Sequence, residues 1–354
     1  MKEVESILNF RPSSLDEYVG QEEVKRRLRI ALEAAKLRAE PLDHILLAGP
    51  PGLGKTTLAH VIAKELKKNI YVTSGPVIER GGDIAAMLSS LEDGDVLFID
   101  EIHRMNKTAE EVLYSALEDF QVDVMIGKGP TARSVRIRLK PFTLIGATTR
   151  SGLLSSPLRN RFGMIFELDF YSVEELTSII KRACEIMNMS IEHMAAELIA
   201  QRSRGTPRIA LRLLKRVRDV ATVRGEETIT QSIVLKTMDI LEIDALGLDE
   251  MDRKILRTII EIYEGGPVGL EALAATLNVE VDTLKEVYEP YLLRTGLLVR
   301  TSRGRVASDL AYRHLGYESR VRGGLFDGYV AEHSEDQRED NSGGSQGSSR
   351  SEFR

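Results

Sequence analysis

Two short segments of the chain carry residues arranged for phosphate chemistry. The first, residues 49–56, reads Gly-Pro-Pro-Gly-Leu-Gly-Lys-Thr and matches the pattern G-x-x-x-x-G-K-[ST] between an apolar strand and a helix. Its glycines let backbone N–H groups curl around phosphate, and the helix N-terminus adds its dipole. Lys55 would reach the β- and γ-phosphates, and Thr56 would offer a hydroxyl to Mg²⁺. The nucleotide ligands predicted here are Gly52, Gly54, Lys55, Thr56 and Thr57.

The second segment, residues 96–101, is an apolar strand that ends in two acids. Asp100 is placed to hold Mg²⁺ through the coordination shell of the ion, and Glu101 is placed to polarise an attacking water. The pair follows the first segment by about 45 residues, which is typical of the second half of a nucleotide site. The adjacent acids favour ATP hydrolysis. His103 and Arg104, next along the chain, are interpreted as a solvated helix start.

A third apolar strand, residues 142–147, ends in Thr148-Thr149-Arg150. If this strand neighbours the other two, the hydroxyl of Thr148 would stand beside the γ-phosphate. An ordinary threonine-rich strand exit remains the alternative.

The elements that must position these residues alternate between strands and helices. Strands are predicted at 44–48, 70–73, 96–100, 142–148 and 164–168, and helices at 24–38, 55–67, 83–91 and 108–120. This order predicts an α/β fold with a parallel sheet covered on both faces. Residues 122–139 alternate around Gly127, Gly129 and Pro130 and predict a β-hairpin inserted into that layer.

Beyond residue 168 the pattern predicts helices only. Helix starts are expected at Ser172, which forms a capping box with Glu175, at Ser190, and at Thr206-Pro207. A linker is expected at 243–249. The pattern after it predicts a winged helix-turn-helix, with helices at 249–263 and 270–277, a helix capped by Asp282, and two short strands at 297–301 and 305–308. The predicted domains are 1–171, 172–242 and 245–320, followed by a disordered tail at 321–354.

The net charge of the chain and its distribution indicate whether nucleic acid could be a binding partner. The chain has 48 Lys and Arg against 54 Asp and Glu, a net charge of −6, which argues against nucleic acid if the charge is spread evenly. Residues 291–320, however, contain six arginines and two acids, a local balance of +4. A basic wing binds phosphate, without reading bases. The alternative is a winged helix that mediates protein contacts.

The chain shows no signal peptide and no stretch of 18 apolar residues, so a cytoplasmic location without a membrane partner is expected. The single cysteine, Cys184, lies in an apolar-periodic stretch and is expected to be buried.

These segments, with Pro157-Leu-Arg-Asn-Arg-Phe-Gly163 and Gly205-Thr-Pro-Arg208, occur in the order found in AAA+ ATPases. Within them, Phe98-Ile-Asp-Glu-Ile-His-Arg104 and Gly265-Gly-Pro-Val-Gly-Leu270 make the chain resemble the RuvB family of Holliday-junction branch-migration motors, from about Phe10 to Tyr317. The resemblance implies an AAA+ P-loop domain, a helical lid domain and a winged-helix head domain. It also implies a homo-hexamer that uses ATP and Mg²⁺ and acts on duplex and four-way junction DNA with RuvA and the RuvC resolvase.

The resemblance also implies roles for single residues. Arg161 resembles an arginine finger supplied to a neighbouring subunit; without the family it would be interpreted as a helix-end residue on a solvated face. Arg208 resembles the lid residue that senses the nucleotide, whereas Arg204, Arg212 and Arg216 are expected on a solvated basic face. Hairpin 122–139 resembles the element that docks RuvA; the alternative is a hairpin packed on its own domain. The remaining implied residues are Phe10 and Arg11 at the adenine, Tyr171 at the hinge, Glu118, Asp119 and Phe120 near the nucleotide, and Arg300, Arg303 and Arg305 on DNA.

Two other functions compete with a DNA motor. The same core occurs in ATP-driven loaders or switches that assemble proteins on DNA, although neither a C-terminal collar nor a longer base-reading domain is evident in this sequence. A P-loop kinase acting on a small molecule is disfavoured by the Asp100-Glu101 pair and by the separate DNA-type domain.

Overall fold

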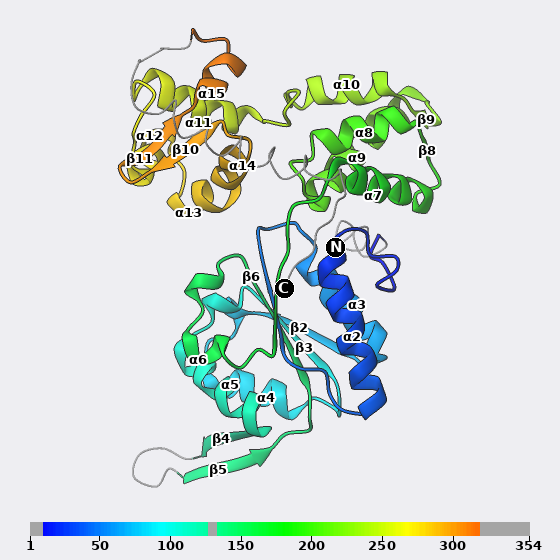
Figure 1. Cartoon of the computed structure of the whole chain (residues 1–354), viewed down its shortest axis with the longest axis vertical. Helices are drawn as coiled ribbons and strands as arrows, with labels where there is room; N and C mark the ends of the chain where they lie inside the picture. Colours follow the sequence, from blue (N-terminus) through cyan, green and yellow to red (C-terminus); the bar gives the residue numbers. More distant parts are fainter. Residues whose placement is uncertain (1–9, 127–132, 319–354) are drawn as a thin grey trace, which may run out of the picture.

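The computed structural model describes residues 10–126 and 133–318. Figure 1 shows an α/β domain with a helical lid and a winged-helix head beyond one end of it. The tail predicted at 321–354 and the tip of the predicted hairpin lie outside the described residues.

The α/β domain is built on five parallel strands in the order β2-β3-β6-β1-β7. The strands are β1 (Ile45–Ala48), β2 (Ile70–Ser74), β3 (Val96–Asp100), β6 (Thr143–Thr148) and β7 (Met164–Glu167). Successive side chains point to opposite faces of a sheet, so Ile45 and Leu47 enter one core while Leu46 enters the other. All five predicted strands are confirmed to within one residue at each end.

Helices cover both faces of this sheet, as predicted. Helices α2 (Glu22–Arg38) and α3 (Lys55–Leu66) contribute to the first core, which continues into the lid. Helices α4 (Gly81–Ser89) and α5 (Lys107–Asp119) contribute to the second core, with the short helix α6 (Ser156–Arg159). Short 3-10 turns at 75–77, 102–104 and 151–153 follow the strand ends.

The predicted hairpin is present as β4 (Gln121–Ile126) paired antiparallel with β5 (Arg133–Arg138). Its base packs on its own domain, because Val122 and Leu139 are buried in the second core. Figure 1 shows the hairpin projecting from the end of the α/β domain opposite the lid. The side chains of Arg133 to Arg136 are exposed on this projection.

The lid consists of α7 (Val173–Ile186), α8 (His193–Gln201), α9 (Pro207–Arg224) and α10 (Gln231–Ile240). The capping box of Ser172 and Glu175 is confirmed. The helix start expected at Ser190 is wrong: this residue opens the strand β8 (Ser190–Ile191), which pairs with β9 (Thr228–Ile229), and α8 begins after Glu192. A two-residue strand pair leaves too short a pattern for its period to be read from the sequence.

The head is a winged helix with its own core. It contains α11 (Glu250–Glu261), α12 (Leu270–Leu277), α13 (Val281–Thr283), a π-helical turn (Leu284–Tyr288), α14 (Glu289–Arg294), the wing strands β10 (Leu298–Thr301) and β11 (Gly304–Ala307), and α15 (Asp309–His314). The prediction that Asp282 caps a helix is wrong, because the N-cap position is Glu280. The Asp282 carboxylate instead pairs with Arg150 of the α/β domain at 3.1 Å.

A buried charge cluster joins the lid to the head. The Arg204 guanidinium contacts Asp249 at 2.9 Å and Asp252 at 2.5 Å, and it lies over the ring of Tyr291 at 5.4 Å. Asp252 is fully buried, and only 9% of the Arg204 side chain is exposed. The expectation that Arg204 lies on a solvated face is therefore wrong, because its partners come from a helix more than 40 residues away.

Among the described residues, no helix is long and apolar enough to cross a membrane. Cys184 is buried in the first core as predicted, and burial raises the pKa of its thiol to about 11.

Candidate nucleotide and DNA sites

The sheet order brings the three chemistry-bearing segments together. The phosphate loop follows β1, the two acids end β3, and β6, which ends at Thr148, lies between these two strands. Because all three strands are parallel, their carboxyl ends share one edge of the sheet. A cleft at this edge is lined by Lys55, Thr56, Asp100 and Glu101, and the lid closes its other side.

The phosphate loop includes a position that requires glycine. Gly54 has φ of +94°, and a Cβ atom there would lie 2.8 Å from the hydroxyl of Tyr18. The Lys55 ammonium donates to the carbonyls of Gly49 at 2.7 Å and Pro50 at 2.9 Å. Burial lowers the pKa of Lys55 to about 8, although Asp100 and Glu101 act to raise it.

This pKa predicts that nucleoside triphosphate affinity falls as the pH rises above about 8. Below that value Lys55 is charged in both the free and the bound site, so the affinity should be constant. Above it, the phosphates must draw a proton onto Lys55, and Kd should rise by about tenfold per pH unit. Titration with a fluorescent nucleotide from pH 7 to 9.5 measures this slope. Lys55→Arg is the control, since a guanidinium stays charged and its Kd should not follow pH. A flat wild-type profile would contradict the prediction.

The two acids differ in backbone geometry. Asp100 ends β3, and its carboxylate accepts the N–H of Glu101 at 3.0 Å. Glu101 has φ of +47°, a left-handed conformation that is uncommon for a residue with a side chain. Gly75, at the end of the neighbouring strand, allows this: a Cβ atom there would lie 2.4 Å from the Glu101 carbonyl oxygen. Strain of this kind clusters at functional sites.

The third strand places Thr149, rather than the predicted Thr148, toward the acids. Thr148 is fully buried, its hydroxyl lies 2.9 Å from His103 Nδ1, and it accepts the N–H of Arg150 at 3.0 Å. The hydroxyl of Thr149 instead donates to Glu101 Oε2 at 3.4 Å. Thr148 is the last residue of β6 and Thr149 follows the strand, and only Thr149 contacts the acids. The expectation of a solvated His103 is also wrong, whereas Arg104 is exposed as expected.

The lid contributes a row of cations. The backbone N–H of Arg208 donates to the carbonyl of Gly52 at 3.4 Å, so α9 begins directly against the phosphate loop. Arg212, Lys215 and Arg216 follow on the same helix and also line the cleft. Arg212 and Arg216 are exposed, as predicted for a solvated basic face, and their spacing of four and eight residues from Arg208 places this face along the cleft.

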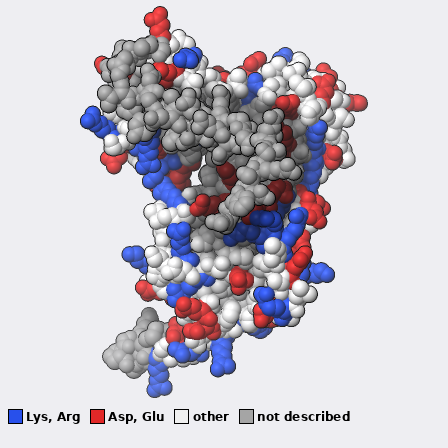
Figure 2. All heavy atoms as spheres, viewed as in Figure 1, with Lys and Arg blue, Asp and Glu red and all other residues white. Residues whose placement is uncertain are grey.

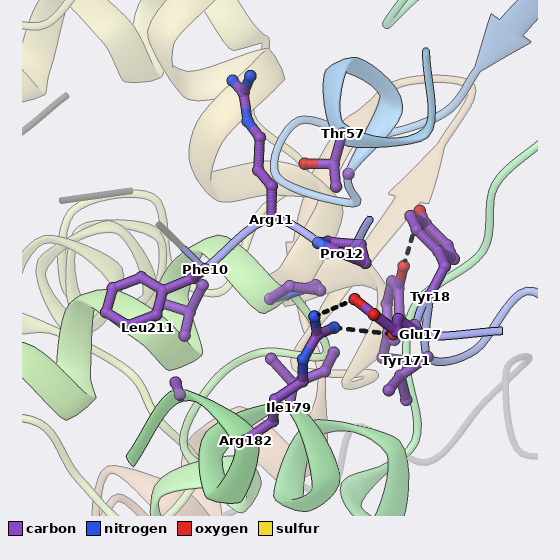
Figure 3. A pocket seen from close by; sticks show the side chains of 14 residues that line it. Phe10, Arg11, Pro12, Glu17, Tyr18, Thr57, Tyr171, Ile179, Arg182 and Leu211 are labelled. Atoms are coloured by element: carbon purple, nitrogen blue, oxygen red, sulfur yellow. Dashed lines mark hydrogen bonds and ion pairs between the residues drawn. The ribbon is translucent and has the colours of Figure 1, made fainter. Parts of the chain in front are cut away.

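A smaller side pocket adjoins the phosphate loop, and Figure 3 shows it. It is lined by Phe10, Arg11, Thr57, Tyr171 and Leu211, among others. The structure thus brings together three residues expected at the adenine or the hinge. The Tyr171 hydroxyl lies 3.2 Å from the Leu53 carbonyl and 3.1 Å from the Tyr18 hydroxyl, and burial raises its pKa to about 12. Tyr18, which sequence analysis missed, has no motif to mark it.

Arg161 does not line the cleft of its own chain. Its guanidinium pairs with Glu118 at 2.9 Å, donates to the carbonyl of Pro157 and stacks on Tyr114 at 4.8 Å. The neighbouring residues Asp119 and Phe120 lie away from the cleft as well, and Phe120 packs on Phe142. This group is therefore not part of the cleft of its own chain.

The wing presents fewer free cations than the sequence suggests. Arg300 and Arg303 are exposed, but the Arg305 guanidinium forms two hydrogen bonds to Glu289 at 2.8 and 3.1 Å with both side chains nearly buried. The structure therefore does not favour Arg305 as a DNA contact. Figure 2 shows positive and negative side chains interspersed over the described parts of the face in view.

Comparison with known proteins assigns each part of the chain. Models of the Holliday junction DNA helicase RuvB P-loop domain, the RuvB AAA lid domain and the RuvB C-terminal winged helix domain match residues 10–168, 171–244 and 245–316. The Holliday junction branch migration complex subunit RuvB of Pseudothermotoga lettingae is 74% identical over 321 residues, which cover 91% of this chain and 94% of that protein.

The protein of the same description from Thermotoga maritima is 70% identical over 309 residues, 87% of this chain and 92% of its own length. A solved structure of the Thermotoga maritima RuvB Holliday junction branch migration motor superposes with a TM-score of 0.81 at 66% identity, over 88% of this chain and 99% of that one.

Proposed function

Because the chain belongs to the RuvB family of Holliday-junction branch-migration motors, we propose that its cleft hydrolyses ATP to move junction DNA. As a member of this family it is an AAA+ P-loop ATPase and a branch-migration motor. The observation that carries the assignment of the site is the meeting of Lys55, Asp100 and Glu101 with the lid residue Arg208 in one cleft.

Thr56 and Asp100 fit an Mg²⁺ ion. Both are oxygen donors that line the cleft, which suits a hard cation shared with nucleotide phosphates. Within residues 10–126 and 133–318, no group of three or more His, Cys, Asp or Glu side chains could hold a metal, so the ion would depend on phosphate oxygens and water for its remaining ligands. When bound, it would neutralise charge on the β- and γ-phosphates.

The protein's own residues would then act as follows. Lys55 would release the loop carbonyls and bind the terminal phosphates, and Glu101 would accept a hydrogen bond from the attacking water. Thr149, next to Glu101, would contact the γ-phosphate. Arg208 would bind the nucleotide from the lid side, and Phe10 and Arg11 would contact the adenine in the side pocket.

Arg161 supports a ring. With Glu118, Asp119 and Phe120 it lies outside the cleft of its own chain, so we propose that this group completes the site of a neighbouring subunit. Head-to-tail contacts of this kind close into rings, and a homo-hexamer is the ring proposed for this chain.

Arg300 and Arg303 are proposed to hold duplex and junction DNA through phosphates. RuvA is proposed to bind hairpin 122–139, because the hairpin projects away from both the lid and the head. The RuvC resolvase is proposed as a further member of the complex. No observation favours a loader or a small-molecule kinase, and all three domains match the RuvB models.

A branch-migration assay with RuvA, ATP and a synthetic four-way junction tests the proposal. Wild-type protein should separate the junction into duplexes, and Lys55→Ala should not. Arg303→Ala should still hydrolyse ATP, but it should bind DNA more weakly and with a salt slope smaller by about 0.9. The matched control is Lys254→Ala, an exposed cation on α11 of the head. Wild-type protein that hydrolyses ATP yet moves no junction would overturn the motor assignment.

A further inference from the structure

A histidine with no role assigned so far lies against the proposed catalytic carboxylate. His103 is on the short turn that follows the acids, and only 4% of its side chain is exposed. Its Nε2 atom lies 3.4 Å from Glu101 Oε2, and its Nδ1 atom lies 2.9 Å from the hydroxyl of Thr148. We propose that His103 is a positioning residue for ATP hydrolysis, which orients the Glu101 carboxylate toward the attacking water. This inference rests on the role proposed for Glu101.

The partners of the two ring nitrogens of His103 indicate which nitrogen carries the proton. Thr148 Oγ already accepts the N–H of Arg150 at 3.0 Å, so its own proton is free to be donated to His103 Nδ1. Burial lowers the pKa of His103, although Glu101 acts to raise it, so the ring is neutral and carries one N–H. A carboxylate can only accept, so the tautomer with its proton on Nε2 satisfies both contacts: Nε2–H faces Glu101, and Nδ1 accepts from the Thr148 hydroxyl.

The contacts to Glu101 are one-sided. His103 Nε2 and the hydroxyl of Thr149 both lie 3.4 Å from the same oxygen, Oε2. Such contacts are often long before substrate is bound and tighten in the reacting complex. When Thr149 turns to the γ-phosphate, His103 remains on Oε2, and Oε1 is left to accept from water. His103 therefore does for Glu101 what an orienting residue does for a general base.

The contacts of His103 also start from a residue, Thr148, that is held rigidly in the sheet. Thr148 is fully buried in β6, which is bonded to a strand on each side. On its outer side, His103 faces Arg150, which pairs with Asp282 and Glu286 of the head. A buried anchor on one side and a carboxylate on the other are what a positioning residue needs.

Three variants of His103 separate its contact with Glu101 from its contact with Thr148. His103→Ala removes both and should lower kcat for ATP by about 10- to 100-fold, as loss of an orienting partner does elsewhere. His103→Gln places an amide near the Nε2 position and should retain more activity than His103→Asn, whose amide is near the Nδ1 position. KM for ATP and the thermal unfolding midpoint should stay close to wild type in all three. Arg104→Ala, at the exposed neighbouring position, is the control and should leave kcat unchanged.

A double-mutant cycle with Glu101→Gln tests whether His103 acts through the carboxylate. If it does, adding His103→Ala to Glu101→Gln should lower the hydrolysis rate no further. Multiplied losses, an unchanged kcat in His103→Ala, or a loss explained by KM or by unfolding would overturn the inference. Wild-type hydrolysis by Glu101→Gln alone would instead overturn the proposed site, and the inference with it.

Discussion

Arg161→Ala should lower the rate of ATP hydrolysis by about 10³-fold or more, with little change in the affinity for ATP. A guanidinium that meets charge developing on the transferred phosphate is worth about 10³ to 10⁵ in rate. The affinity should survive because Arg161 does not line the cleft that binds the nucleotide in its own chain. Steady-state hydrolysis and titration with a fluorescent nucleotide measure the two quantities. Arg159→Ala, at an exposed position two residues earlier, should keep the wild-type rate.

Mixing two inactive variants shows whether Arg161 acts in trans. Lys55→Ala lacks the phosphate-binding lysine but keeps Arg161, whereas Arg161→Ala has an intact cleft. In randomly mixed rings about one quarter of the interfaces would pair an intact cleft with an intact Arg161, so activity should return to about that level. Co-purification of differently tagged chains verifies that the subunits have exchanged. If mixed rings verified in this way remained inactive, Arg161 would act within its own chain or not at all.

If Arg161 acts on a neighbour's phosphate as proposed, its guanidinium has to leave Glu118. Their ion pair at 2.9 Å is partly exposed, with 59% of the Glu118 side chain in solvent, so it contributes about 1 kcal/mol or less. Two further donations, to the carbonyls of Tyr114 and Pro157, hold the guanidinium without balancing its charge. The side chain is therefore held in place but is not neutralised by a buried partner, which suits a residue that moves to a substrate.

Much of this architecture could be predicted from sequence, because the signals are local. Strand and helix periods fixed the layers, and the parallel sheet then forces the phosphate loop, Asp100 and the end of β6 to one edge. The capping box at Ser172 and the pairing of the two wing strands likewise involve residues that are close together in the sequence.

The errors concern side chains whose partners are distant in sequence. His103 and Arg104 are adjacent and polar, yet only the first meets Thr148, 45 residues away. Which of two consecutive threonines faces the cleft depends on the exact end of β6, and sequence patterns do not fix a strand to one residue. Arg305 is included in the +4 balance of residues 291–320, but its partner, Glu289, lies just outside that segment. A local charge balance therefore overstates the number of cations that lack an internal partner.

The second large effect is expected at the lid–head junction, where Arg204→Ala should destabilise the protein by about 3 to 5 kcal/mol. The substitution leaves Asp252 buried without its cation, and loss of one member of a buried pair costs about that much. The control is Arg26→Ala, which removes a solvent-exposed pair with Glu23 and should have little effect on stability. Hydrogen exchange at α9 and α11 should show the loss locally, since several domains need not unfold in one step.

The pH dependence of Arg204→Ala distinguishes a stranded charge from lost packing. In the wild type, burial raises the pKa of Asp252 to about 7, and Arg204 acts to lower it. Without Arg204 that pKa should be higher still. A carboxyl group whose pKa is raised by folding favours the folded state when protonated, so stability is lost as the pH rises from about 4 through the folded pKa. The variant should therefore be less stable at pH 8 than at pH 6, and Asp252→Asn in the same chain should remove most of that difference. A loss that is equal at both pH values would mean that Arg204 supports the junction through packing on Tyr291 rather than through charge.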